Sequence, residues 1–405
     1  HPTRTNGLGI DDPSNNLVDN PATPEIEGRI ISDTDWQDQV YRTAISTDHN
    51  FSARANLYKK IPFRASFGYN RTEGLVKTND YERFAYSVKM TPKLLDDNLK
   101  IDFNAKGTIT TKNAIDDGGA IGGAVAMDPT KPVYSSNSIF GKYYQETLLN
   151  GNRNQIEGAS NPLAILEQRT RPERAIRFLG NIEFDYKLPF LRDLRAVVNL
   201  GLDASEARIR EVFADNSIAT YRFNQGSDPA TNYVFNPGEN YLENQTSTNQ
   251  TMDAYLAYSK TMTGFVTKVD AQGGYTYQNF KVDGYSDRYR YNDQTGLRES
   301  VINPNNPNNR YYNPLNLQAY FARANVDILD KYLFTATFRA DGSSLFQENK
   351  RWGYFPAVGA AWKIKDESFL KDSNFVQNLK LRVGWGKTGQ QNITGSVGYF
   401  PSSPL

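Results

Sequence analysis

Hydrophobic and polar residues alternate with a period of two along much of this chain. In the run that begins at Leu99, one face carries Leu, Ile, Phe and Ala, and the other carries Lys, Asp, Asn and Lys. The runs that begin at Phe178 and Tyr320 alternate in the same way. This pattern is typical of β-strands with one apolar face. Because the runs approach the ~9–11 residues with which a tilted strand crosses a bilayer, each is a candidate membrane strand.

The same pattern predicts twelve strands in all and very little helix. The other nine candidates lie near residues 51–58, 63–70, 82–90, 194–203, 252–259, 265–277, 332–340, 355–364 and 379–387. The one candidate for a short helix runs from Glu367 to Val376. Residues 1–50 show no regular alternation, and the Asn, Pro and Asp residues up to about Ile30 predict a loop-rich N-terminal segment.

The connections between these strands distinguish a membrane barrel from a soluble β-protein. The very long links, at 111–177, 204–251 and 278–318, fall on every second connection, with short links between them. In an up-and-down meander every second connection lies at the same end, so the long loops share one end. That asymmetry is typical of outer-membrane barrels, whereas a sandwich with Greek-key crossings has no reason to keep it. The pattern predicts an all-β fold, with residues 51–405 as part of a transmembrane antiparallel β-barrel and the three long links as its extracellular loops.

Composition narrows the classes of function. Lys and Arg number 46 and Asp and Glu 45, so no bulk charge favours binding to nucleic acid. The absence of cysteine excludes disulfides, thiol nucleophiles and cysteine-ligated metals. The only histidines are His1 and His49, which leaves little for a metal site or a Ser-His-Asp relay. We therefore expect no catalytic residues, no metal site, no cofactor and no enzymatic activity.

Hydropathy excludes membrane helices but not membrane strands. The mean hydropathy is −0.64, and no window approaches the ~20 apolar residues that a membrane helix needs. A spanning strand buries only alternate residues in lipid, so its polar half cancels the hydropathy signal. The 25 Tyr and 22 Phe favour strands.

No signal peptide opens the chain, and we expect its N-terminus to be truncated. Aromatic residues near predicted strand ends suit interfacial girdles: Tyr69, Tyr81, Tyr332, Tyr354, Trp362 and Trp385.

Three stretches of sequence resemble one family. The first is Thr34–Ala44 (TDWQDQVYRTA), followed by His49–Ser52 (HNFS). The second is Asn161–Ala164 (NPLA), within the longest link. The third is the most specific and runs from KYLF at Lys331 through RADGSSLF and RWGYFP to GKTG at Gly386. In order and spacing these motifs are similar to those of the SusC/RagA family of TonB-linked outer-membrane proteins. The resemblance covers roughly residues 34–110 and 315–395, and it departs from the family pattern at Ala357, where the family has Ser.

The resemblance implies a fold and a function. Transporters of this family are 22-stranded barrels closed by an N-terminal plug, with a TonB box that couples to the inner-membrane motor. A SusD-like surface lipoprotein caps the barrel as a lid. The twelve strands would then be about half of a barrel, with the plug domain and the C-terminal strands absent from this chain. The implied function is TonB-dependent, energy-coupled import of glycan or peptide oligomers across the bacterial outer membrane. The implied partners are the SusD-like lipoprotein, TonB through a region outside this chain, outer-membrane lipid and the oligomer, with no nucleic acid.

Two other classes of function stay open. A passive outer-membrane channel or a surface adhesin could be built on the same barrel, and these would lack the plug and the TonB box. A soluble carbohydrate-binding β-protein or enzyme would need neither membrane nor detergent.

For three short motifs we prefer a structural interpretation to a ligand-binding one. Asp341–Ser344 (DGSS) lacks the Gly spacing and Lys of a phosphate-binding loop, so we expect a turn at a strand end. Gly118–Gly123 (GGAIGG) has no βαβ unit around it, so we expect a flexible outer loop rather than a dinucleotide site. Asp35 and Asp38 flank Trp36 at helical spacing and belong to the family signature.

Aromatic residues of the long links are the candidate substrate-binding residues. Aromatic faces stack on sugar rings and anchor protein interfaces. The alternative is that these side chains pack within the loops or against a lid. The candidates are Tyr134, Tyr143, Tyr144, Tyr233, Phe235, Tyr311 and Tyr312.

Overall fold

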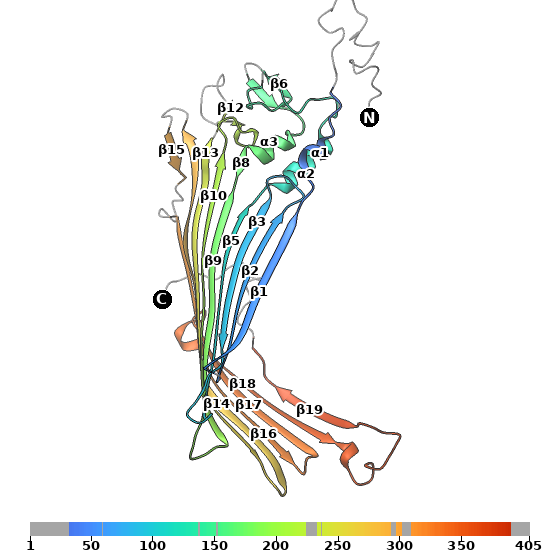
Figure 1. The fold of residues 1–405 in the computed structure, drawn as a ribbon, viewed down its shortest axis with the longest axis vertical. Helices are drawn as coiled ribbons and strands as arrows, with labels where there is room; N and C mark the ends of the chain where they lie inside the picture. Colours follow the sequence, from blue (N-terminus) through green and yellow to red (C-terminus); the bar gives the residue numbers. More distant parts are fainter. Residues whose placement is uncertain are drawn as a thin grey trace, which may run out of the picture.

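One long antiparallel sheet forms most of the molecule. The computed structural model describes residues 32–389, apart from 59, 137, 151–152, 224–232, 236, 293–296 and 302–308. Twelve strands pair in the order in which they follow along the chain, so the predicted meander is confirmed. The sheet is strongly twisted and curled, and its last strands run at a large angle to its first (Figure 1). The twelve are β1 (Ser46–Leu57), β2 (Ile61–Glu73), β3 (Asp80–Met90), β5 (Leu99–Asn113), β9 (Pro172–Lys187), β10 (Leu194–Phe213), β13 (Gly238–Thr261), β14 (Val266–Asn292), β16 (Arg310–Ile328), β17 (Tyr332–Ser343), β18 (Trp352–Lys363) and β19 (Lys380–Gly386).

Short elements occupy the links. None of the helices in the described part of the chain is long and apolar enough to cross a membrane. The helices are α1 (Trp36–Val40), α2 (Asp117–Ala126), α3 (Pro162–Glu167), η1 (Ile218–Thr220), η3 (Glu348–Lys350) and η4 (Ile364–Asp366), and the short strands are β4 (Lys93–Leu94), β6 (Thr147–Asn150), β7 (Arg153–Ile156), β8 (Arg169–Thr170), β11 (Arg222–Phe223), β12 (Tyr233–Val234) and β15 (Leu297–Ser300).

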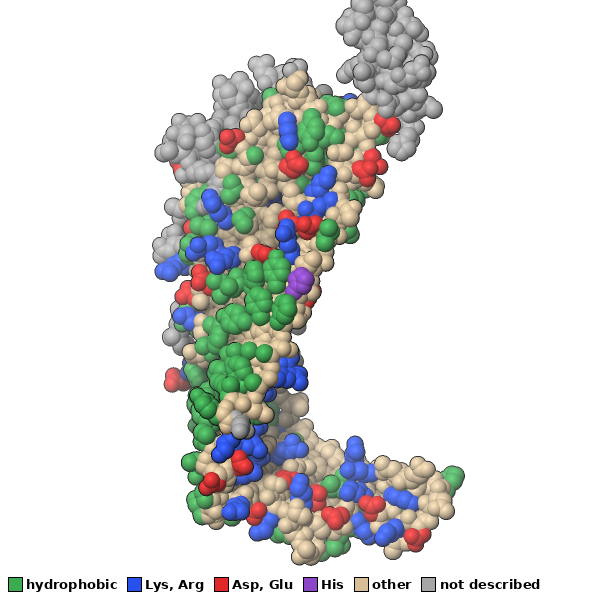
Figure 2. Space-filling model, viewed as in Figure 1, with side chains coloured by type: hydrophobic (Ala, Val, Ile, Leu, Met, Phe, Trp, Pro, Cys, Tyr) green, Lys and Arg blue, Asp and Glu red, His purple; other side chains and the backbone are tan. Residues whose placement is uncertain are grey.

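The register keeps an apolar and a polar face across the sheet. Phe184 of β9 is paired with Ile101 of β5 on one side and Val198 of β10 on the other. The next position, Asp185, is paired with Lys100 on β5. Because alternate residues of a strand point to opposite faces, Phe184 and its partners lie on the apolar face and Asp185 on the polar one. Hydrophobic side chains form a continuous patch over the middle of the upright strands (Figure 2).

Several strands are longer than the alternation predicts. Strands β10, β13, β14 and β16 contain 20, 24, 27 and 19 residues. The predicted links 204–251 and 278–318 are therefore partly strand, and the link between β10 and β13 narrows to 214–237. The pattern missed these extensions because both faces are polar there, as in the run ENQTSTNQT at Glu243. Two polar faces give no period-2 signal.

Two rows of aromatic rings bound the apolar face. Near the short turns, Tyr332 and Trp362 stack with their ring centroids 6.3 Å apart. Toward the long links, Tyr320 stacks on Trp352 at 6.0 Å. Tyr332 lies eight positions before Ala340, which is paired with Tyr320. At ~3.3 Å per residue and a ~35–45° tilt, the rows are roughly 20 Å apart in height, near the ~25 Å of a membrane barrel's apolar band.

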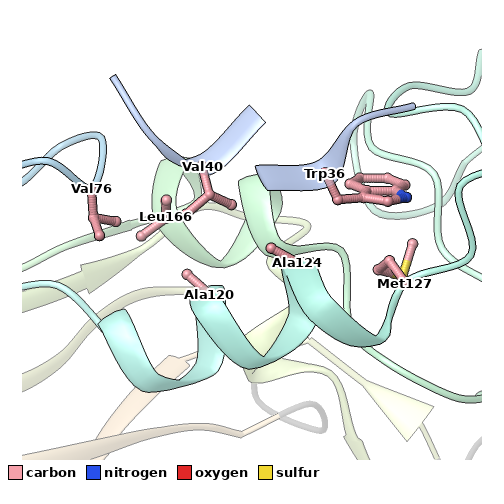
Figure 3. Packing of buried hydrophobic residues seen from close by; sticks show 7 residues of the cluster. All are labelled: Trp36, Val40, Val76, Ala120, Ala124, Met127 and Leu166. Carbon is pink, nitrogen blue, oxygen red and sulfur yellow. The ribbon is translucent and has the colours of Figure 1, made fainter. Parts of the chain in front are cut away.

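The buried core lies at the long-link end, where three short helices meet (Figure 1). One cluster joins α1, α2 and α3 (Figure 3). A second cluster joins α3, η1 and the segment around Phe140. The first contains Trp36, Val40, Val76, Ala120, Ala124, Met127 and Leu166, and the second contains Phe140, Tyr143, Leu163, Ala164 and Ile218.

The glycine-rich segment 118–123 is helical, so the prediction of a flexible loop was wrong. Asp116 caps helix α2 by accepting a hydrogen bond from the backbone N–H of Gly119 at 3.0 Å. A Cβ atom at Gly123 would lie 2.9 Å from the carbonyl oxygen of Ser160. The small residues of α2 thus allow close approach to the chain just before α3. Such a helix has no stripe of large apolar residues, so its sequence carried no helical signal.

The candidate helix from Glu367 to Val376 does not form. Only the 3₁₀ turn η4 forms in this link, just before Glu367. The ammonium of Lys365 donates to the carbonyl oxygens of Leu370, Lys371 and Ser373 at 2.6–3.1 Å. These carbonyls bind one side chain, so the segment closes into turns around Lys365.

Candidate functional site

The polar face of the sheet carries charges of both signs in cross-strand pairs. Asp185 binds Arg195 at 2.7 Å, and Arg177 binds Asp203 at 2.7 Å through two hydrogen bonds. Each pair joins β9 and β10. Each of these pairs joins one cation to one anion and so carries no net charge.

Beyond the aromatic rows, the polar face holds a cluster around Glu243. The hydroxyl groups of Tyr241 and Tyr311 donate to its carboxylate at 2.5 and 2.8 Å. Tyr241 and Glu243 lie on β13, and Tyr311 reaches them from β16 across the intervening strand β14. A Cβ atom at Gly284 of β14 would lie 2.5 Å from the Tyr311 hydroxyl oxygen. The glycine is therefore what allows the tyrosine to cross the strand.

Two arginines flank one of these tyrosines. The guanidinium carbons of Arg171 and Arg288 lie 5.8 and 5.9 Å from the centre of the Tyr241 ring. Burial, followed by the hydrogen bond to Glu243, raises the pKa of Tyr241 to about 12. The same two causes raise the pKa of Tyr311 to about 12. Both hydroxyls therefore stay protonated at neutral pH and act as donors.

Three of the seven candidate aromatic residues pack into the long links, and a fourth, Tyr134, lies beside them. Tyr143 is buried in the second cluster and donates a hydrogen bond to Glu167. Tyr144 packs against the first cluster and Phe235 against the second. Tyr134 is exposed, with its ring centroid 5.7 Å from that of Tyr143. The ammonium of Lys142 lies 5.0 Å from the Tyr134 ring centroid and 5.2 Å from the Tyr143 ring centroid.

The remaining three candidates are not brought together. Tyr311 lies on the polar face, in the cluster around Glu243. The adjacent Tyr312 points to the opposite face, where it is 55% exposed and the Lys281 ammonium lies 5.1 Å from its ring centroid. Tyr233 belongs to β12, and its side chain is outside the described part of the structure.

Sequence reasoning missed Tyr241, Glu243, Arg171 and Arg288. The spacing of Tyr241 and Glu243 places both on one face of a strand, which is a usable signal. Nothing in the sequence pairs them with Tyr311, which follows Glu243 by 68 residues. Within residues 32–389, apart from the gaps stated above, no group of three His, Cys, Asp or Glu side chains is placed to hold a metal ion.

The segment Asp341–Ser344 lies at the end of a strand, as expected, although its first three residues still belong to β17 and only Ser344 begins the turn. Strand β17 ends at Ser343, whose backbone N–H donates to the Arg351 carbonyl oxygen at 3.1 Å. The next residue, Ser344, donates its N–H to the carbonyl oxygen of Asn316 on β16 at 3.0 Å. The link between β17 and β18 is thereby held against the wall.

Comparison with known proteins identifies the family. Residues 134–404 match the family described as "TonB dependent receptor-like, beta-barrel". The TonB-dependent receptor SusC of Bacteroides thetaiotaomicron is 36% identical over 393 residues, which are 91% of this chain and 36% of SusC. The TonB-dependent receptor P3 of Formosa agariphila is 26% identical over 94% of this chain and 35% of its own length. This chain spans about a third of the length of these curated relatives.

Solved structures share the fold. The match to the RagAB peptide importer in its closed-closed state covers 89% of this chain and 39% of the RagAB chain, with a TM-score of 0.66 and 17% identity. The match to the open-open state covers 93% of this chain and 41% of the RagAB chain, with a TM-score of 0.65 and 17% identity. The resemblance to the SusC/RagA group is confirmed by the likeness to SusC, and the chain belongs to the TonB-dependent receptor β-barrel family of the bacterial outer membrane.

Proposed function

We propose that this chain is the barrel wall of a transporter that imports glycan or peptide oligomers across the outer membrane, with energy supplied through TonB. The observation that carries the proposal is the 36% identity to SusC over 91% of the chain. The apolar face contacts lipid, and the polar face lines the path of the oligomer. A wall with paired charges suits a hydrated substrate, because its ions already have partners and do not trap the passing molecule.

The long links face the cell exterior in this proposal. Bacterial barrels keep long loops outside and tight turns in the periplasm. The two core clusters then form a folded platform at the outer mouth. A SusD-like lipoprotein covers this mouth as a lid. Support comes from the likeness to SusC and from the fold shared with RagAB, a peptide importer.

Among the candidate aromatic residues, we assign substrate contact first to Tyr311. Its ring lies on the polar face above the membrane band, beside Tyr241 and Glu243. Tyr143, Tyr144 and Phe235 serve the loop core instead, because they pack against its buried clusters. Tyr134 and Tyr312 are exposed and are available to a lid or a neighbouring molecule.

Uptake by whole cells tests the proposal. Cells with the full-length protein should take up labelled oligomers that cells lacking it exclude. Uptake should stop when TonB is deleted or the proton-motive force is collapsed. Uptake that persists in both conditions would assign the protein to the passive channels. Surface attachment without uptake would assign it to the adhesins.

A further inference from the structure

A cavity opens beside the link between β17 and β18. It has a volume of about 470 Å³ and lies on the polar face of the sheet, at the level of the aromatic row formed by Tyr320 and Trp352. That size falls within the ~300–1,000 Å³ of typical small-molecule sites. Space is left there because the two residues paired with Asp341 of β17, Ala319 and Gly353, have small side chains or none. The link 344–351 folds back over this gap and forms the rim.

Positive charge dominates the lining of the cavity. Among the described residues, Arg339, Lys350 and Arg351 line it, and Asp341 supplies the single carboxylate. Arg339 donates to Asp341 at 2.6 Å, and the two side chains are 50% and 36% exposed. Arg351 donates from Nε to a backbone carbonyl oxygen at 3.2 Å. The ammonium of Lys350 has no hydrogen-bond or ion-pair partner among the described residues. The cavity therefore carries an excess of cationic groups without carboxylate partners.

The lining also offers a ring and a free amide. Phe355 packs on Gly353 and Gly389, where a Cβ atom would come within 2.7 and 2.3 Å of its ring. This backing holds the ring in place at the wall. The side-chain amide of Gln278 lines the same space and has no hydrogen-bond partner in the described part of the chain.

We infer that the cavity is a subsite for an acidic sugar unit of the imported oligomer. This inference rests on the proposed import function. A sugar ring with a carboxylate would pair that group with Lys350 and Arg351 and lay its C–H face on Phe355. Its hydroxyl groups would donate to Asp341 and exchange hydrogen bonds with Gln278. An acidic peptide would satisfy the cations but offers no ring hydroxyls for Asp341, so the sugar fits more of the lining.

Equilibrium binding to the full-length protein in detergent tests the subsite. The probes are tetragalacturonate, the neutral galactose tetramer and tetraglutamate. The wild type should bind tetragalacturonate most tightly, and binding should weaken with salt. Lys350→Gln and Arg351→Gln should each lower that affinity by about two- to fivefold, the range expected of exposed charge pairs. The control is Arg71→Gln, whose 60% exposed side chain lies on β2 and does not line the cavity. Its affinity should equal that of the wild type.

Three outcomes would overturn the subsite. Equal affinity for the acidic and neutral tetramers would remove the role of the cations. Tighter binding of tetraglutamate than of tetragalacturonate would assign the site to peptides. Unchanged affinity in both lysine and arginine variants would place binding elsewhere. Whole-cell uptake separates this failure from that of the import function: TonB-dependent uptake without preference for acidic sugars overturns the subsite alone, whereas absence of all TonB-dependent uptake overturns both.

Discussion

The indole Nε1 of Trp362 donates a hydrogen bond of 3.0 Å to the carboxylate of Glu367. The Tyr332 hydroxyl donates to the same oxygen at 2.6 Å, and the Lys331 ammonium donates to the other oxygen at 3.0 Å. These three donors lower the pKa of Glu367 from 4.5 to about 2, with Tyr332 as the largest cause. One carboxylate thus joins the aromatic row near the short turns, formed by Tyr332 and Trp362, to the link that follows β18.

The stability that Glu367 contributes should depend on pH. Its pKa is lower in the folded state, so folding favours the ionised form, and the contribution is complete above pH 4.5. It should fade as the pH drops from 4.5 toward about 2. Thermal unfolding of the full-length protein in detergent should show Glu367→Gln less stable than the wild type at pH 7, with the gap closing toward pH 2. Glu348→Gln, in an exposed link, is the control. A gap that stays constant down to pH 2 would show that the carboxylate charge is unimportant.

Adjacent residues of β9 should respond differently to a new charge. Phe184→Arg places a guanidinium on the lipid face and should cost roughly 2–4 kcal/mol if the site lies near the midplane. Glu183→Arg, on the hydrated face, should cost much less, because its β5 partner Asp102 can pair with the new cation. Refolding titrations of the full-length protein into bilayers measure both. Equal penalties would contradict the assignment of faces.

Two glycines of β14 should differ in their tolerance of alanine. A Cβ atom at Gly284 would lie 2.5 Å from both the Tyr311 hydroxyl and the Asn244 carbonyl oxygen, whereas at Gly273 the nearest atom is 3.6 Å away. Gly284→Ala should destabilise the protein by about 1–3 kcal/mol, and Gly273→Ala should stay within about 0.5 kcal/mol. Chemical unfolding in detergent gives both values. If Gly284→Ala proves as mild as Gly273→Ala, the tyrosine does not cross β14 as described.

Labelling of introduced cysteines should establish which end faces the cell exterior. Residues 1–405 contain no cysteine, so within this part of the protein each label reports the introduced site. Ser136→Cys and Gln347→Cys, in the longer links, should react with an impermeant maleimide on intact cells. Lys60→Cys and Arg192→Cys, in short turns, should react only after the outer membrane is breached. Reaction of the short-turn pair on intact cells would reverse the proposed orientation.

The sequence predicted the strands wherever one face of the sheet contacts lipid. At Phe184 and Asp185 the two sides of β9 differ so strongly that alternation reveals both the strand and its orientation. The outer half of β13 has polar residues on both faces, so its pattern carried no signal and the strand was placed in a loop. Helix α2 was not predicted for a related reason: its contacts are made by Gly123 and Ala120 and need no large apolar side chain.

The candidate site was harder to predict because its contacts depend on register. Tyr311 was singled out as a loop aromatic, but its partner Glu243 could be found only from the pairing of three strands and the gap at Gly284. The neighbouring Tyr143 and Tyr144 looked equally available, yet their side chains pack into two different clusters. Composition alone does not separate an aromatic residue on a pore wall from one inside a loop core.

The length of β14 sets how far the wall extends beyond the apolar band. Its apolar face ends near Tyr277, and the strand continues to Asn292. At ~3.3 Å per residue and a ~35–45° tilt, this extension raises the rim roughly 40 Å above the hydrocarbon. If the protein imports oligomers as proposed, a bulky oligomer would first contact the wall in open solvent, clear of the lipid head groups, and would enter the protein before it reached the level of the lipid tails.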